Sequence, residues 1–568
     1  MELIYERLKE WIEYTFSLDN LISLLQYDPT NPFIFTKLPF WIFLVLILPG
    51  FALVAKRTFL RNVYLMIVSM FFYYKTSGLF VLILVFSTVS DYFLGLFIHN
   101  ADKQWLKRIG VALSVFINLF VLSYFKYAYF FVDVLNQMFD THFVVFNWFA
   151  HWANEAMGTH FEVGEILLPV GISFYTFQTI SYSVDVYRGH VQPVRNILDF
   201  AFYVSFFPQL VAGPIVRASE FVPQLYKPFK LSKQEFGFAN YMIIKGLIKK
   251  MIFGDLIAVN FIDRVFANPT MFGGFENVMA AFGYSLQVYA DFSGYTDIAI
   301  GIAKLFGFDL PKNFNYPYKA QNVGEFWKRW HMSLSNWLKD YLYIPLGGNR
   351  HGSVGSLIVV IIIAIVIFFL AKNQLWIIML LVWTLVALGL LYIYPPTRRH
   401  VTTNINLMLT MLLGGLWHGA SWNFVIWGGL NGLGLVIYKY WRKISPFTGT
   451  KNPIAIVFAV LLTFTFITFT RFWFRAPDTQ TVDLMFHQII NHFDTSIIPE
   501  VIKGYWVFFL LFALGMVLHW LPQKVKDSWL HFFENAPFIV HIIAFFITVI
   551  IVYQAAAAGL QPFIYFQF

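Results

Sequence analysis

Histidine is the side chain in this sequence best suited to proton transfer, because its ordinary pKa of about 6.5 lies close to neutral pH. The chain contains 14 histidines, and most lie near the ends of apolar segments or in polar stretches, where solvated side chains are expected. His418 differs because it lies in GGLWHGASWNF, between two apolar runs. An ionisable group at such a position is expected to face a cavity. His418 is therefore a candidate general base, with a structural histidine at a helix end as an equal alternative.

The neighbours of His418 suit a slot for a substrate. Gly415 and Gly419 leave room for a chain to approach closely, and Trp417 supplies a wall that excludes water. Asn423 follows in the same motif and is a further candidate tunnel residue.

A second candidate catalytic residue, His331, lies in the polar and aromatic stretch EFWKRWHMSLSNW. Arg329, Trp330 and Asp340 accompany it and are candidate substrate-binding residues. Burying this many charges is costly unless they pair or line water. Two interpretations stay open: a structural network of ion pairs, and a binding site for the polar head of a donor molecule.

The third cluster is YSLQVYADFSGYTDIAIG, in which polar residues interrupt an apolar helical stretch. Gln287, Asp291 and Ser293 are candidate tunnel residues, because aspartate inside a membrane span usually marks function. The alternative is that Asp291 and Ser293 only form hydrogen bonds to neighbouring helices.

The sequence contains no cysteine, which excludes disulfides, thiolate metal sites and an acyl group carried on a protein thiol. Any covalent acyl carrier must therefore use oxygen or nitrogen. No metal site and no bound cofactor are predicted.

The elements that position these residues are expected to lie in a membrane. Hydrophobic residues make up 58% of the 568 residues and charged residues only 12%, with a mean hydropathy of +0.63. Such a chain is too apolar for an ordinary soluble protein. The net charge of +9 comes from short basic clusters beside apolar segments, a pattern that indicates membrane orientation and contact with lipid headgroups, not nucleic acid.

Apolar windows long enough for roughly a dozen transmembrane helices can be placed along the chain. We therefore predict an all-α, multi-pass integral membrane protein with one membrane domain, residues 1–568. Residues 1–40 are expected to be an interfacial segment without a cleaved signal. Residues 310–350 are too polar to cross a bilayer and are expected to be re-entrant or interfacial. No internal repeat of the transporter type is evident. The predicted windows are 41–55, 60–72, 79–97, 111–132, 167–183, 200–211, 238–261, 278–306, 354–370, 375–394, 402–416, 425–440, 454–472, 506–520 and 538–553.

Several ordered motifs resemble the membrane-bound O-acyltransferase (MBOAT) family. The resemblance is to its bacterial alginate O-acetyltransferase branch, which is related to the membrane protein of D-alanyl-teichoic-acid transfer. The motifs are LPVGISFYTFQTISYSVDVYRG, FFPQLVAGPIVR, QVYADFSGYTDIAIG, FWKRWHMSLSNWLKDYLYIPLGGNR, GGLWHGASWNF and RFWFRAP, between Leu168 and Pro477.

The resemblance implies a fold of tilted helices around a central funnel, with the family core at residues 168–475 and C-terminal helices at 476–568. It implies that His418 is catalytic and that His331 lies along the same tunnel. His418 would then act as general base on an acceptor hydroxyl, which attacks a thioester supplied from the cytoplasmic side. Acyl-CoA or an acylated carrier protein would be the donor.

The chain ends in PFIYFQF, which resembles the FxYxxF ending found in this branch. There the tyrosine is thought to accept the acyl group and pass it outward, which makes Tyr565 a candidate catalytic residue. A phenol with a pKa near 10 leaves more readily than a sugar hydroxyl, so its ester keeps much of the transfer potential of a thioester. The alternative for Tyr565 is an aromatic anchor at the membrane interface.

We therefore expect an O-acyltransferase of a bacterial cytoplasmic membrane that moves a short acyl group, expected to be acetyl, toward an extracytoplasmic polysaccharide or similar envelope polymer. The expected partners are membrane lipids, the thioester donor, the polymer, and an extracytoplasmic serine-type (SGNH) acyltransferase. Two alternatives stay open: a transporter or flippase of an envelope precursor, and an acyltransferase that modifies a lipid or a protein.

Overall fold

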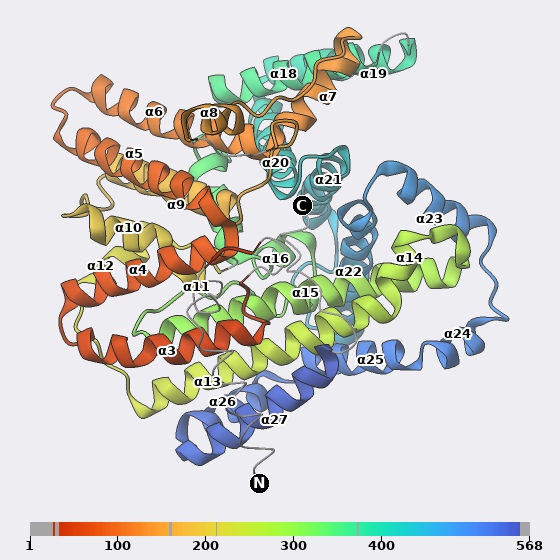
Figure 1. Ribbon diagram of the computed structural model, residues 1–568. Coiled ribbons are helices and arrows are strands. Elements are labelled where there is room, and N and C mark those ends of the chain that lie inside the picture. Colours follow the sequence, from red (N-terminus) through yellow and green to blue (C-terminus); the bar gives the residue numbers. More distant parts are fainter. Residues whose placement is uncertain are drawn as a thin grey trace.

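The computed structural model describes residues 26–28, 33–157, 162–211, 213–350, 352–371 and 374–556. Within these ranges every regular element is a helix, which confirms the predicted all-α class (Figure 1). Most of the predicted interfacial segment 1–40 lies outside the described residues. The same holds for Tyr565 and the rest of the C-terminal motif, so both remain predictions.

The helices follow one another from α3 to α27. The first group is α3 (Leu38–Val54), α4 (Thr58–Ser77), α5 (Val81–Asn100), α6 (Gln104–Leu122), α7 (Ala128–Phe139), α8 (Trp148–Met157), α9 (Ile172–Tyr187), α10 (Ile197–Ser205), α11 (Phe207–Leu210), α12 (Ala218–Leu225), α13 (Lys233–Ile248), α14 (Asp263–Ala267) and α15 (Gly274–Leu305). The second group is α16 (Val323–Trp327), α17 (Met332–Leu338), α18 (Val354–Leu370), α19 (Leu375–Ile393), α20 (Pro395–His418), α21 (Trp422–Ile444), α22 (Pro453–Arg475), α23 (Thr479–Asn491), α24 (Ile498–Gly504), α25 (Trp506–Trp520), α26 (Gln523–Asn535) and α27 (Phe538–Ala556). In the part of the chain that the structure describes, four π-helical turns interrupt or extend them: η2 (Ser123–Tyr127), η3 (Lys249–Leu256), η4 (Ala258–Ile262) and η7 (Lys339–Tyr343).

Local sequence signals explain several of the helix starts. The side chain of Asn322 accepts a hydrogen bond from the backbone N–H of Glu325 at the start of α16, and Asp478 caps α23 in the same way. Proline opens α20 and α22, where its missing N–H costs nothing.

Four helical stretches among the described residues are long and apolar enough to cross a membrane, and six are if each of two bent helix pairs counts as one span. The four are Thr58–Asn100, Gln104–Phe139, Leu375–Ile393 and Pro453–Arg475. The expected count of about a dozen spans is therefore not confirmed. Two expected windows fold as helices of only 17 residues, Leu38–Val54 and Val354–Leu370, and others are broken by π-turns or polar residues.

Helix α15 runs through the centre of the molecule, with α13 beside it (Figure 1). Small residues allow this contact. A Cβ atom on Gly246 of α13 would lie 2.5 Å from the carbonyl oxygen of Gly294, and one on Gly301 of α15 would lie 2.6 Å from that of Ala239. The two backbones therefore touch directly, as is common for helices that pack in a membrane.

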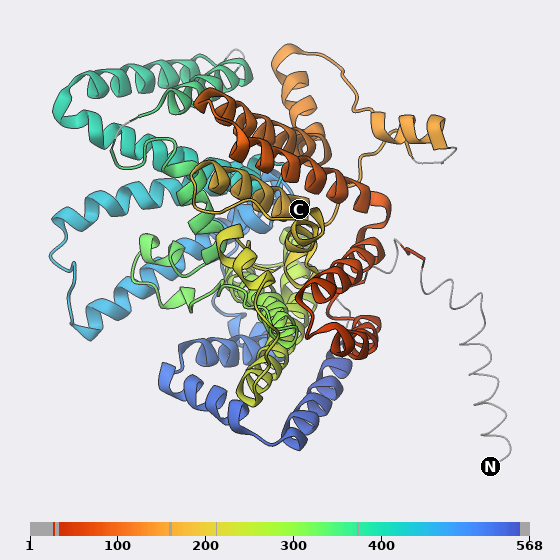
Figure 2. The same cartoon turned by 90° about the vertical axis from the view of Figure 1, so that its left-hand side faces the viewer.

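The C-terminal helices, drawn in blue, lie at one end of the molecule, and the helices of residues 354–418, drawn in green to teal, lie at the opposite end (Figures 1 and 2). Helices α15, α21 and α22 lie between these two ends (Figure 1). This arrangement brings α20 and α21 above α15, where the candidate site lies.

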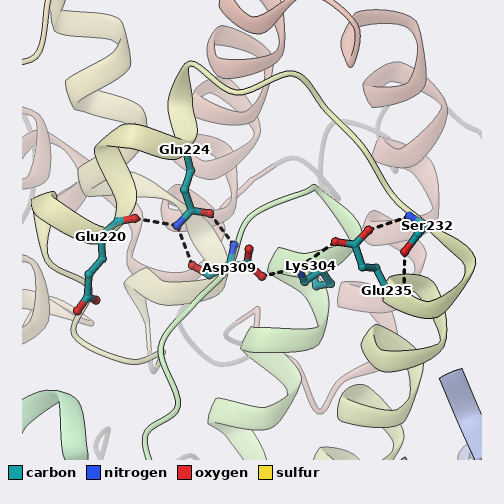
Figure 3. Close-up of polar contacts among 6 residues, drawn as sticks. All are labelled: Glu220, Gln224, Ser232, Glu235, Lys304 and Asp309. Atoms are coloured by element: carbon teal, nitrogen blue, oxygen red, sulfur yellow. Dashed lines mark hydrogen bonds and ion pairs between the residues drawn. The ribbon is translucent and has the colours of Figure 1, made fainter. Parts of the chain in front are cut away.

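A polar network holds the end of α15 in place (Figure 3). Lys304, in the last turn of α15, forms ion pairs with Glu235 and Asp309. Glu235 also accepts a hydrogen bond of 2.8 Å from the backbone N–H of Ser232, and the Ser232 hydroxyl accepts one from the backbone N–H of Glu235. This reciprocal pair is a capping box at the start of α13. Gln224 of α12 exchanges two hydrogen bonds with the backbone of Asp309. These contacts join three chain segments at one corner of the fold.

The segment 310–350 contains no helix longer than the seven residues of α17. It consists of short helices and turns packed against α15, α20 and α21. The expectation of a non-spanning element in this part of the chain agrees with this structure.

Candidate functional site

The motif around His418 forms the junction between two closely packed helices. His418 is the last residue of α20, and α21 begins at Trp422, as the sequence predicted. A Cβ atom on Gly428 would lie 2.3 Å from the carbonyl oxygen of Met411, and one on Gly415 would lie 2.3 Å from that of Phe424. No side chain separates the two helices here, so the position of His418 is fixed by contact between backbones.

Aromatic rings surround the imidazole of His418, which is only 2% exposed. The ring centroid of His418 lies 5.0 Å from that of Trp417, 5.1 Å from that of Trp427 and 5.3 Å from that of Phe474. These rings come from α20, α21 and α22. Trp417, the predicted wall of the slot, packs against the imidazole but lines a separate cavity of about 80 Å³, so its role toward a substrate remains a prediction.

His418 lines a cavity of about 370 Å³. One wall of this cavity comes from α20 and α21, and the other comes from the short helices α16, α17 and η7. The lining includes Trp327, Lys328, Met332, Ser335, Asn336, Lys339, Tyr343, Leu407, Thr410, Gly414, His418 and Trp427. The imidazole is therefore buried in the fold and still borders a space large enough for part of a substrate.

His331 lies beside this site but is fully buried, with 0% exposure. Its ring centroid is 6.5 Å from that of His418 and 6.1 Å from that of Trp417. The Nδ1 atom lies 3.1 Å from Oδ1 of Asn313. His331 also has a left-handed backbone, with φ of 42°. This conformation is uncommon for a residue other than glycine and is typical of sites held by their surroundings.

A buried arginine that the sequence analysis did not single out lies behind the aromatic wall. The guanidinium carbon of Arg471 is 4.5 Å from the ring centroid of Trp330, 5.1 Å from that of Phe474 and 6.0 Å from that of Trp427. Arg471 is 1% exposed, and none of its three side-chain nitrogens has a hydrogen-bond partner among the described residues. The predicted site residue Trp330 therefore contacts this cation and does not line the cavity of His418.

A second overlooked contribution comes from the span Gln104–Phe139. Lys126 and Tyr127, in the π-helical turn η2, donate hydrogen bonds to backbone carbonyls at the end of α20. The sequence does contain an indication of this role, because Lys126 is the single charged residue in the apolar window 111–132.

Arg329 and Asp340 do not join His418. Arg329 binds Glu325 through two nitrogens, at 2.9 and 2.7 Å, and Asp340 pairs with Arg217 at 2.8 Å. These contacts match the alternative of a structural ion-pair network. Their predicted role in binding a donor remains a prediction.

The polar residues of α15 also lie apart from His418. Asp291 forms an ion pair with the buried Lys250 of η3, and the hydroxyl of Ser293 accepts a hydrogen bond of 3.2 Å from Lys249. Phe292, between them, contacts the ring of His331 at 4.7 Å. Gln287 is partly buried, and its predicted tunnel role remains a prediction. The residue of α15 that contacts the surroundings of the site is therefore Phe292, and not one of the predicted polar residues.

Asn423 lies one residue into α21 and is 2% exposed. Its side-chain nitrogen donates to the carbonyl of Ala476, at 3.0 Å. This bond joins the start of α21 to the end of α22. Asn423 therefore supports the junction, while its predicted tunnel role remains a prediction.

A second cavity, of about 490 Å³, adjoins the first, because Leu407 lines both. It is basic, being lined by Arg399, His400, Lys439 and Arg442. Within the described residues none of these four forms an ion pair with a carboxylate. The positive charges of Lys443, Lys439 and Arg399 lower the pKa of the exposed His400. This cavity suits a ligand with negative charge.

The first cavity has a side chain that is suited to proton transfer. A single imidazole borders a space whose walls are mostly apolar and aromatic, with Lys328 and Lys339 among the polar residues. An electrostatic interaction in such a space is stronger than in water. A hydroxyl group placed in this space could give its proton to His418 while its oxygen attacks an acyl carbonyl.

Comparisons with known proteins give one family. The model of "MBOAT, membrane-bound O-acyltransferase family" matches residues 193–369, a range that includes His331 and ends before His418. A "Probable alginate O-acetylase AlgI" of Azotobacter vinelandii is 38% identical over 442 residues, 76% of this chain and 72% of the relative. A "Peptidoglycan O-acetyltransferase" of Helicobacter pylori is 34% identical over 495 residues, 82% of this chain and 80% of the relative. A "Teichoic acid D-alanyltransferase" of Bacillus subtilis is 27% identical over 309 residues, 53% of this chain and 67% of the relative.

Proposed function

Because the chain belongs to the membrane-bound O-acyltransferase family, we propose that it transfers a short acyl group from a thioester donor to a hydroxyl acceptor, with His418 as general base. An imidazole nitrogen of His418 takes the proton of the hydroxyl, and the oxygen attacks the thioester carbonyl. When the tetrahedral intermediate collapses, the carbon–sulfur bond breaks and the thiolate leaves. The imidazolium then returns the proton to the sulfur.

The observation that carries this proposal is that His418 lines the cavity of about 370 Å³ while its ring is 2% exposed. A buried imidazole without access to a cavity could not meet two substrates. Three aromatic rings pack against the imidazole, and one of them, Trp427, also lines the cavity. Limited access of water to the imidazole favours transfer to an acceptor over hydrolysis of the donor.

The adjoining basic cavity supports a donor that carries phosphate groups. Coenzyme A thioesters and phosphopantetheine carrier proteins both do, and guanidinium groups bind phosphate well. Arg399 and Arg442 lie at the start of α20 and the end of α21, and clusters of such cations beside apolar segments are typical of the cytoplasmic side. The donor is therefore proposed to enter from the cytoplasm, with its thioester directed along the shared wall at Leu407.

The proposed acceptor path leads outward through Tyr565 to an envelope polymer. Relatives named for alginate, peptidoglycan and teichoic acid support a polymer of this kind, and those named O-acetylase or O-acetyltransferase support acetyl as the acyl group. An extracytoplasmic serine-type acyltransferase would complete the transfer. The proposed location is the bacterial cytoplasmic membrane.

The test uses the full-length protein purified and reconstituted in phospholipid vesicles. Radiolabelled acetyl-CoA and an acetylated carrier protein are supplied separately, and both thioester cleavage and acyl transfer to the protein are measured. We expect cleavage with at least one donor, and a loss of about 10²-fold or more in His418→Gln. His99→Gln, at the exposed end of α5, serves as the matched control.

Two outcomes would contradict the proposal. Full activity of His418→Gln would mean that the base lies elsewhere. Movement of a labelled envelope precursor across the vesicle membrane without cleavage of either thioester would instead support a transporter.

A further inference from the structure

Lys126 is unusual because it is a charged residue in the middle of a candidate membrane span, Gln104–Phe139. A lysine at such a position is costly unless its ammonium group is satisfied by the protein. It lies in η2, where a π-helical turn widens the helix between α6 and α7. Such turns often occur at functional sites.

The ammonium group of Lys126 is directed at the end of α20. Its Nζ donates hydrogen bonds of 2.7 Å to the carbonyl of Trp417 and 3.1 Å to that of His418. The hydroxyl of the next residue, Tyr127, donates one of 2.9 Å to the carbonyl of Leu416. Two adjacent side chains of one π-turn therefore bind three consecutive carbonyls of α20.

These carbonyls need partners from outside their helix. The last carbonyls of an α-helix have no N–H group to bind within the helix, and a positive charge at this end is favourable. After His418 the helix ends and the backbone of Gly419 is extended, with φ of −162°. A Cβ atom on Gly419 would lie 2.0 Å from the ring of Phe424, so the turn has almost no freedom to adjust.

We propose that Lys126 is a positioning residue for His418: by binding the carbonyls of Trp417 and His418, it holds the end of α20 in the orientation that directs the imidazole into its cavity. This inference rests on the proposed role of His418 as the general base. Lys126 itself does not touch the reacting groups, because it lines a separate cavity of about 80 Å³ on the side of Trp417.

The test compares Lys126→Met, Lys126→Gln and Lys126→Arg with the wild type in reconstituted vesicles. A small displacement of a reacting group can reduce a rate by about 10²-fold. We expect kcat of Lys126→Met to fall by this order while KM for the donor changes by less than about threefold. Lys126→Arg keeps a cationic donor and is expected to recover most of kcat. Tyr127→Phe, which removes only the bond to Leu416, is expected to show a smaller loss.

Any of three results would overturn the inference: an unchanged kcat in Lys126→Met, a raised donor KM with normal kcat, or an arginine variant as slow as the methionine variant. If Lys126→Met does not fold, the comparison of Lys126→Gln with Lys126→Arg decides in the same way.

A second measurement needs no turnover and so separates this inference from the proposed function. The rate at which diethyl pyrocarbonate modifies His418 is read by mass spectrometry of the peptide that contains it. In the lysine variants that fold, we expect the rate at His418 to change several-fold while the rate at the exposed His99 stays constant. Equal rates at His418 in all variants would refute the positioning role even if no acyl transfer were detected.

Discussion

The imidazole rings of His331 and His418 lie with their centroids 6.5 Å apart, although His331 directly precedes the short helix α17 and His418 ends the long helix α20. Their surroundings differ. His418 borders a cavity, whereas His331 is fully buried and lies against Asn313. We therefore expect His418 to react and His331 to support the wall of the site.

The first prediction separates these two roles. His418→Gln is expected to lower kcat by about 10²-fold or more, because it removes the base. His331→Gln is expected to lower kcat less and to lower the unfolding temperature, because it disturbs the buried contact with Asn313. A buried polar group that is left without a hydrogen bond costs about 1–3 kcal/mol. Steady-state kinetics and thermal unfolding in detergent measure both effects. The reverse order of the two kcat losses would contradict the assignment.

The second prediction concerns the contact between α20 and α21. Gly428→Ala is expected to destabilise the protein and reduce activity, because the new Cβ atom would lie 2.3 Å from the carbonyl oxygen of Met411. Gly389→Ala in α19 is the control, since nothing lies within 4 Å of a Cβ atom there. Alanine favours a helix over glycine by about 1 kcal/mol, so the control is expected to be neutral or slightly stabilising. Equal effects of both substitutions on unfolding temperature would show that the contact is not tight.

The third prediction tests the basic cavity with two kinds of donor. The double variant Arg399→Gln, Arg442→Gln is expected to raise KM for acetyl-CoA by about tenfold or more, since charge-assisted hydrogen bonds to phosphate are worth about 1.5–3 kcal/mol. Kinetics with S-acetyl-N-acetylcysteamine, which has no phosphate, should be unchanged. Equal losses with both donors would place the effect in the fold instead of in phosphate binding.

The fourth prediction concerns the proposed outward relay. Tyr565→Phe is expected to leave donor cleavage intact and to abolish acylation of the envelope polymer, because the phenol oxygen is the proposed carrier. Mass spectrometry of polymer isolated from cells that carry each variant gives the readout. Tyr394→Phe removes a hydroxyl from an exposed tyrosine and serves as the control. Normal polymer acylation by Tyr565→Phe would rule out the relay.

The fifth prediction concerns how the stability contributed by Glu235, in the polar network of Figure 3, depends on pH. A hydrogen bond from the backbone N–H of Ser232 lowers the pKa of Glu235, and Lys304 contributes to the shift. A carboxyl group whose pKa is lowered by folding stabilises the protein above its ordinary value near 4.5, and this contribution is lost as the pH falls through the lowered value. Glu235→Gln should therefore lower the unfolding temperature by about 2 °C or less at pH 7. Below pH 4 the difference from the wild type should shrink. If the unfolding temperatures of Glu235→Gln and the wild type differed by the same amount at pH 7 and below pH 4, the stabilising role of the Glu235 carboxylate would be contradicted.

Parts of the site were accessible from the sequence because they depend on local pattern. The placement of His418 at the end of one helix and before another follows from two apolar runs separated by small residues, and the structure confirms it. The non-spanning character of residues 310–350 follows from their charge, and the short helices found there agree.

Contacts between distant segments were not accessible. Asp291 was predicted to be a tunnel residue, but in the structure it forms an ion pair with Lys250. Lys250 lies on another helix, so the spacing of residues in the sequence could not identify it as the partner. Lys126 is far in sequence from the carbonyls that it binds. Both side chains are charged residues in apolar surroundings, so the sequence indicated that each needs a partner, but only the packing of the helices decides which partner each one finds.

The direct backbone contact of Gly428 with α20 has a mechanical consequence. Because no side chains separate α20 and α21 here, the two helices are expected to move as one rigid body. His418 and the wall of the cavity that these helices form therefore stay fixed relative to each other. Any opening and closing around a substrate must then come from the opposite wall, where the short helix α17 continues directly into the π-helical turn η7.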